Sequence, residues 1–189
     1  VIDVKAGEQV AVWHGHIPPD ELAVEVYRVG IWYGNALCCV ESNNHGLTTI
    51  VQLRQLGYPN LFRKRSLNTE NNRISQEYGW RTTRTSKPLM IDDLAKALKN
   101  EELVIHCEST IAELRTFVRN DKGGMSGSPY DDRVMSLALA NQMRKYAHIP
   151  EYAPVVDDTW TVDWWRRQIP DKVPEQHGII GQGAIRGTV

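Results

Sequence analysis

Residues 36–46 read ALCCVESNNHG, a run of five apolar residues followed by an acid and a polar turn. A continuous apolar run of this length is typical of a central strand that helices cover on both faces. Glu41 stands where that strand ends, and open α/β sheets build their sites at the carboxyl ends of strands. Because many strands end in a polar residue, Glu41 alone is a weak indication of function.

Helices and strands are predicted on both sides of this strand in the sequence. Residues 9–13 alternate as a strand, and residues 18–33 have a helix start with proline and acids, followed by an apolar face. Downstream, the pattern predicts helices at 46–56, 90–98 and 131–146, strands at 61–63 and 103–105, and a helix then a strand over 109–117. It also predicts a polar excursion or hairpin at 66–80 and a Gly/Ser-rich loop at 121–129. Strands alternating with helices indicate an α/β layered fold.

Length and composition bound the class of protein. The 189 residues include 41% hydrophobic and 24% charged side chains, which excludes a largely disordered chain. No apolar run approaches the ~18 residues that a membrane span needs, so no membrane partner is expected. We expect one domain over residues 1–149 and a Pro/Gly-rich tail over residues 150–189. Since Val1 stands inside what reads as a strand, the chain is expected to be a piece of a longer protein.

Positive charge is concentrated in one block. Residues 54–87 hold eight basic side chains against two acidic ones, whereas residues 1–53 hold two against six. Within the block, Arg81, Arg84 and Lys87 are spaced among hydroxyl side chains, and these residue types are the usual phosphate contacts. The block indicates a region that binds a polyanion, with a solvated positive face or polar loop as the alternative.

A pair of acids begins the 131–146 helix. Aspartate is a leading N-cap residue, so one of Asp131 and Asp132 needs no functional explanation. Two adjacent carboxylates repel each other, and a divalent cation relieves that repulsion better than a helix dipole does. The pair is therefore a candidate metal site, with helix capping as the alternative.

Four motifs, in this order and spacing, resemble those of one family. They are residues 41–46 (ESNNHG), 82–87 (TTRTSK), 103–106 (LVIH) with 116–117 (TF), and 131–138 (DDRVMSLA). Over about residues 8–146 the chain is similar to the C-terminal nuclease domain of the large terminase subunit of tailed bacteriophages. The resemblance implies an RNase H-like α/β fold, with a mixed central β-sheet flanked by helices on both faces.

The resemblance also implies an activity and partners. The activity is that of a divalent-metal-dependent DNA endonuclease, a hydrolase that cleaves concatemeric double-stranded viral DNA during genome packaging into the procapsid. The implied partners, in the host cytoplasm, are double-stranded DNA, an upstream ATPase domain of the same polypeptide, the portal protein and the small terminase subunit. The printed residues contain no phosphate-binding loop of the Walker type, so no ATP site is expected in this chain.

Matched to the family motifs, Glu41 is the second acid, and Asp131 and Asp132 occupy the third acidic position. These are the implied catalytic and metal-binding residues for two Mg²⁺ or Mn²⁺ ions, which would activate water and stabilise the charge of phosphodiester hydrolysis. The family's first acid lies on a strand before residues 9–13 and has no counterpart here, since Asp3 is too close to that strand. The expected DNA contacts are Arg63, Lys64, Arg65, Arg84 and Lys87.

Two other functions stay open at this point. Another RNase H-like nuclease, of resolvase or transposase type, would share the fold and acids but lack the motifs at 82–87 and 103–117. A DNA-binding or portal-docking module without catalysis is an alternative of a different class, and the missing first acid favours it.

Overall fold

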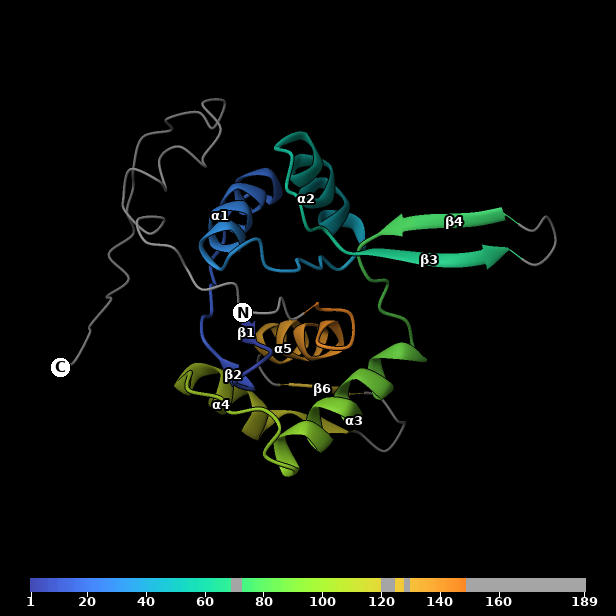
Figure 1. Ribbon diagram of the computed structural model, residues 1–189. Helices are drawn as coiled ribbons and strands as arrows, with labels where there is room; N and C mark the ends of the chain where they lie inside the picture. Colours follow the sequence, from blue (N-terminus) through green and yellow to red (C-terminus); the bar gives the residue numbers. More distant parts are fainter. Residues whose placement is uncertain (69–72, 120–124, 128–129, 149–189) are drawn as a thin grey trace.

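The computed structural model of the chain describes residues 1–68, 73–119, 125–127 and 130–148 (Figure 1). Within these ranges the helices are α1 (Pro19–Trp32), α2 (Asn44–Gln55), α3 (Ser86–Lys99), α4 (Glu108–Thr116) and α5 (Asp132–Met143). Three two-stranded antiparallel sheets pair β1 (Ile2–Asp3) with β2 (Glu8–Gln9), β3 (Arg63–Asn68) with β4 (Arg73–Tyr78), and β5 (Val118–Arg119) with β6 (Met125–Ser126). The protein is a mixed α/β chain. None of its described helices is long and apolar enough to cross a membrane.

The helices that the sequence predicts are present, with shifted ends. The largest shift is in α3, which begins at Ser86 and not near Met90. Pro88 does not delay this helix, because in the first turn the N–H that proline lacks would have no helical acceptor. The predicted loop at 121–129 contains β6, and the rest of that loop lies outside the described residues apart from Gly127. The predicted tail at 150–189 also lies outside them.

The predicted mixed central sheet is not formed as a continuous ladder by the described residues. Single parallel bridges join Cys38 to Leu61, Glu41 to Trp80 and Glu8 to Val104. The expected strands at 36–40 and 103–105 are reduced to bridges at Cys38 and Val104, and that at 61–63 to a bridge at Leu61 and the first residue of β3. Of the expected strand at 9–13, only Gln9 belongs to a strand, β2. The neighbouring segments stay extended for too few residues to build a ladder, since a hairpin begins two residues after Leu61 and a turn precedes α3 soon after Trp80.

The extended segment 37–40 separates two apolar cores. Side chains alternate between the two sides of an extended chain. Accordingly, Cys38 and Val40 pack on the core of α1 and α2, whereas Leu37 and Cys39 pack on the core of α3 and α5. Figure 1 shows α1 and α2 on one side of the molecule and α3, α4 and α5 on the other. Helices therefore cover both faces of a thin extended layer.

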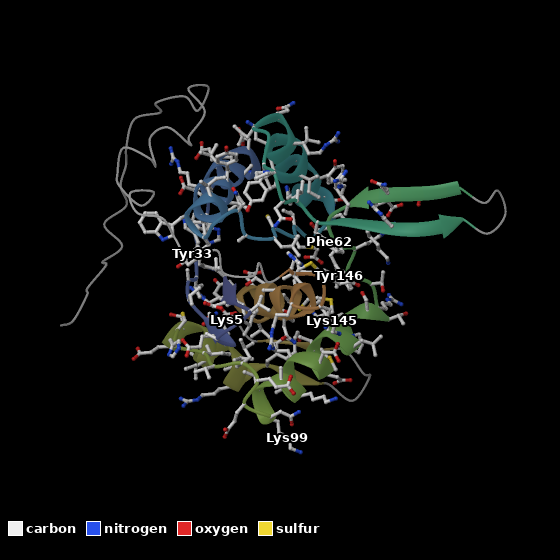
Figure 2. All side chains as sticks on the ribbon, in the orientation of Figure 1. Lys5, Tyr33, Phe62, Lys99, Lys145 and Tyr146 are labelled. Atoms are coloured by element: carbon white, nitrogen blue, oxygen red, sulfur yellow. The ribbon has the colours of Figure 1, made fainter. Side chains whose placement is uncertain are left out.

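The hairpin of β3 and β4 extends away from the helices (Figure 1). Its register runs from Arg63 opposite Tyr78 to Asn68 opposite Arg73, so the polar segment predicted at 66–80 is a hairpin. Phe62, just before β3, is buried and packs against Tyr146 after α5, with ring centroids 5.0 Å apart (Figure 2). This contact anchors the base of the hairpin to the body of the protein.

Candidate functional site

Glu41 lies where the extended segment gives way to α2. The backbone on both sides of it is fixed, because Trp80 N donates to Val40 O (2.9 Å) and Ser42 N donates to Trp80 O (2.8 Å). Gly46 packs so closely that a Cβ at that position would overlap the Glu41 carbonyl oxygen. The half-buried Glu41 also borders a hollow of about 460 Å³ beside the first turns of α1 and α2. The glycine of the 41–46 motif is therefore required by this close approach of the two backbones.

Asp131 occupies the N-cap position of α5 but does not cap the helix. Its backbone has φ −133° and ψ 12°, and its side chain makes no capping hydrogen bond. Its Oδ2 atom instead accepts a hydrogen bond from Lys87 Nζ at 3.2 Å, in a pair whose side chains are each 28% exposed. Asp132 follows as the first residue of α5 and is exposed. Helix capping therefore does not account for Asp131.

The turn before α3 positions Lys87. Thr83 N donates to Ser86 Oγ (2.8 Å), and Ser86 N donates to Thr83 Oγ1 (3.0 Å). This reciprocal pair has the spacing of a capping box, but it closes the turn before α3, whose N-cap residue Thr85 makes no side-chain capping hydrogen bond. Two hydroxyls of the 82–87 motif thus hold the helix start, whereas Arg84 between them is exposed. The expectation that Lys87 precedes the helix is wrong, because it lies in the first turn of α3.

Glu113 of α4 contacts the start of α5, and the sequence reading missed it. Its Oε2 accepts a hydrogen bond from Arg133 N (2.9 Å), and its Oε1 accepts one from the Arg133 guanidinium (2.5 Å). A signal was available, because a cation in the first turn of a helix is disfavoured by the helix dipole. Arg133 in that position therefore indicates an acidic partner from elsewhere in the chain.

The predicted acids are only partly gathered. Asp131 contacts Lys87 and Asp132 follows it in the chain, but the described part of the chain holds no group of three His, Cys, Asp or Glu side chains that could bind a metal ion. Glu41 instead borders the hollow beside α1 and α2, and neither Asp131 nor Asp132 lines that hollow. Since Mg²⁺ keeps several waters and is often held by one or two carboxylates, the aspartate pair is a donor set that fits it.

Three predicted DNA contacts are exposed at the start of β3: Arg63, Lys64 and Arg65. The Arg63 guanidinium lies 5.6 Å from the ring centroid of Tyr78, and the Arg54 guanidinium lies 4.6 Å from the same centroid. Lys64 Nζ lies 5.9 Å from the ring of Trp80, the residue that pairs with the strand end. Cation–π contacts thus hold these charges at the base of the hairpin. Arg54 is a member of this basic cluster that the sequence reading did not single out as a contact.

Other polar groups near the termini of the extended segments have local roles. Asp3 Oδ1 accepts hydrogen bonds from the backbone N–H groups of Lys5 and Ala6, so it belongs to the turn between β1 and β2. His106 Nε2 lies 3.5 Å from a carboxylate oxygen of Glu8. Burial raises the pKa of the Cys38 thiol to about 12, which keeps it protonated at neutral pH.

No protein-family model matches this chain, and no curated protein sequence is significantly similar to it.

Proposed function

We propose that this chain is a divalent-metal-dependent DNA endonuclease with an RNase H-like fold, of the kind found in the large terminase subunit of tailed bacteriophages. One observation carries the proposal. Asp131 stands at an N-cap position without capping, next to Asp132 and 3.2 Å from the ammonium of Lys87. An acid that is not needed by its helix, beside a second acid and a cation, suits the binding of a metal ion and a phosphate.

The chemistry of these groups agrees with phosphodiester hydrolysis. Asp131 and Asp132 would hold one divalent ion together with water, and Glu41 would contribute to a second. Mg²⁺ or Mn²⁺ bound there would lower the pKa of a bound water and stabilise the charge on the phosphate. Lys87 would hold a phosphate oxygen at the edge of the acids, where negative charge increases in the transition state.

The layered fold gives weaker support. Helices cover both faces of the extended segment 37–40, and the bridges of Cys38 to Leu61 and of Glu41 to Trp80 are parallel. A mixed central sheet of the RNase H type would need longer strands and remains part of the proposal. The cleavage of concatemeric DNA, the upstream ATPase domain, the portal and small-subunit partners and the host cytoplasm also belong to the proposal.

The first test measures Mn²⁺ binding by calorimetry on the chain as it stands. The wild type should bind Mn²⁺, and the double variant Asp131→Asn/Asp132→Asn should lose at least about tenfold in affinity, since both charged ligands are gone. Asp20→Asn, which removes an exposed acid from the first turn of α1, is the matched control and should bind as the wild type does. Equal affinities in all three proteins would refute the metal site.

The second test measures plasmid cleavage. Because the family's first acid has no counterpart, cleavage is assayed on a protein extended at its N-terminus by the family's first-acid strand. Glu41→Gln and Asp132→Asn should each abolish cleavage in Mn²⁺ and leave the circular dichroism spectrum unchanged. Full cleavage by both variants would exclude these residues from catalysis.

A non-catalytic DNA-binding module is the second candidate, favoured by the lack of a three-ligand cluster in the ranges that the structure describes. It predicts DNA binding that EDTA does not change, and no cleavage even by the extended protein. A nuclease of resolvase type would instead prefer four-way junctions to linear duplexes in the same assay.

A further inference from the structure

The start of α5 is capped by a side chain from another helix. In an ordinary N-cap, the side chain of the cap residue accepts a hydrogen bond from the second or third N–H group of the helix. In α5 the second N–H group of the helix belongs to Arg133. It donates to Glu113 Oε2 of α4, at 2.9 Å. Glu113 therefore uses the donor that Asp131 would otherwise take.

The backbone of Asp131 differs from that of an ordinary cap residue. N-cap residues are typically extended, whereas Asp131 has φ −133° and ψ 12°. Gly127 also lies close to Asp131. A Cβ at Gly127 would overlap the Tyr130 carbonyl oxygen and lie 3.3 Å from the Asp131 Cβ. Gly127 thus lies close to the backbone of Tyr130 and to Asp131, and the Asp131 carboxylate is directed to Lys87 and not to its own helix.

We propose that Glu113 is a positioning residue that takes over the cap of α5 and so keeps the Asp131 carboxylate available for a divalent cation. The metal part of this inference rests on the proposed function. The charge of Glu113 does not add to the repulsion between Asp131 and Asp132, because the Arg133 guanidinium neutralises it at Oε1. Glu113 is only 11% exposed, so it is shielded from the metal ion and from DNA and acts through Asp131 alone.

Loss of Glu113 should change the position of the Asp131 side chain. When Arg133 N–H has no acceptor, the Asp131 side chain should turn to it, because a partly buried N–H without a partner is unfavourable. Asp131 should then leave Lys87 and adopt an extended backbone. Because Asp131 would then cap α5, the helix should be preserved. The protein should therefore stay folded while it loses Asp131 as a metal ligand.

Two variants and one control test this. Glu113→Ala removes the acceptor, and Glu113→Leu/Arg133→Leu removes it without leaving the Arg133 charge buried and unpaired. Glu113→Gln is the control, since its amide oxygen can still accept the backbone N–H. Metal-free crystal structures should show Asp131 on the residue 133 N–H in the first two proteins and on Lys87 in the control.

Mn²⁺ calorimetry on the same proteins gives the second measurement. The affinity should fall about 10- to 100-fold in the alanine and double-leucine variants, as is typical when a partner that orients a metal ligand is lost, and should change little in Glu113→Gln. Asp131 remaining on Lys87 in the double variant would overturn the inference, as would an unchanged Mn²⁺ affinity despite a moved Asp131. If the wild type bound no Mn²⁺, the proposed function would fail. The crystal structures would still show whether Asp131 replaces Glu113 as the cap of α5.

Discussion

Lys87 Nζ lies 3.2 Å from Asp131 Oδ2, so a cation from the first turn of α3 is bound to the acid at the start of α5. The two residues are 44 positions apart in the sequence, and the fold brings together one residue expected to contact DNA and one expected to bind metal. Because both side chains are partly exposed, the ion pair should contribute only about 0.2–1 kcal/mol, so we expect a divalent ion or a phosphate to displace it.

Replacing Lys87 should therefore change metal binding and cleavage in opposite directions. In Lys87→Gln no cation competes for Asp131, so Mn²⁺ affinity should rise, by up to about fivefold if the pair contributes ~0.2–1 kcal/mol. Cleavage by the N-terminally extended protein should fall, because the charge that steadies the phosphate is lost. Calorimetry and plasmid cleavage measure the two effects. Lys99→Gln, at the other end of α3, should change neither, and a fall in Mn²⁺ affinity in Lys87→Gln would contradict the competition.

Replacing Gly46 should destabilise the protein, although a glycine-to-alanine change inside a helix usually stabilises it by roughly 0.5–1 kcal/mol. The added Cβ would overlap the Glu41 carbonyl oxygen, so α2 or the strand end must move. We expect Gly46→Ala to lower the free energy of unfolding by about 1–3 kcal/mol, the usual range for overpacking. Urea denaturation measures it, with Thr48→Ala at an exposed position of the same helix as the control. A stabilised Gly46→Ala protein would show that there is room for a Cβ between Gly46 and the Glu41 carbonyl oxygen.

Asp93 should make stability depend on pH in the acid range. Hydrogen bonds from Lys145 and then Gln142 hold the pKa of its carboxyl below the usual value near 3.8. A carboxyl whose pKa is lower in the folded state stabilises the protein above its unfolded-state pKa, and that stability is lost as the pH falls through the lowered folded-state pKa.

Asp93→Asn should accordingly lower the free energy of unfolding by about 0.2–1 kcal/mol at pH 7, the range for exposed ion pairs. The difference from the wild type should shrink below about pH 4 and disappear once Asp93 is protonated in both the folded and the unfolded protein. Urea denaturation at a series of pH values measures it. Lys145→Gln, which removes the first hydrogen bond to Asp93, should show the same trend, and a difference that is constant with pH would argue against the pair.

The helices could be predicted because their signals are local. Pro19 with the acids after it, and the apolar face of α5, follow from spacing within a few turns of chain. The strands could not be predicted in the same way. The run at 36–40 has the apolar composition of a central strand, but a ladder also requires neighbours that stay extended for as long. Leu61 and Trp80 each provide only one parallel bridge, and nothing in the run itself contains that information.

The same distinction applies to the site. The pair Asp131 and Asp132 was recognisable because two adjacent acids at a helix start exceed what one cap requires. Glu113 was not recognisable from its own surroundings, since an acid in a short amphipathic helix is usually solvated. Its role depends on the packing of α4 against the start of α5, which becomes visible only in three dimensions.

The basic residues at the start of α3 should determine how DNA binding depends on salt. Arg84 is exposed in the turn that precedes Lys87, whereas Lys99 is exposed at the opposite end of the same helix (Figure 2). Each phosphate that a protein neutralises on duplex DNA contributes roughly −0.9 to the slope of log affinity against log salt. Arg84→Ala should therefore make the slope shallower by about that amount, while Lys99→Ala should leave it unchanged.

Fluorescence anisotropy with two duplexes of unrelated sequence, at several salt concentrations, measures both the slope and the sequence dependence. Phosphate contacts carry no sequence information, so Arg84→Ala should weaken binding equally on the two duplexes. Unequal losses would indicate that Arg84 reads base edges. If Arg84→Ala and Lys99→Ala made the salt slope shallower by the same amount, DNA binding would depend on the overall charge of α3. It would then not depend specifically on the end of α3 that holds Lys87. A flattening confined to Arg84→Ala would place the DNA backbone at the start of α3, the end of the helix from which Lys87 contacts Asp131.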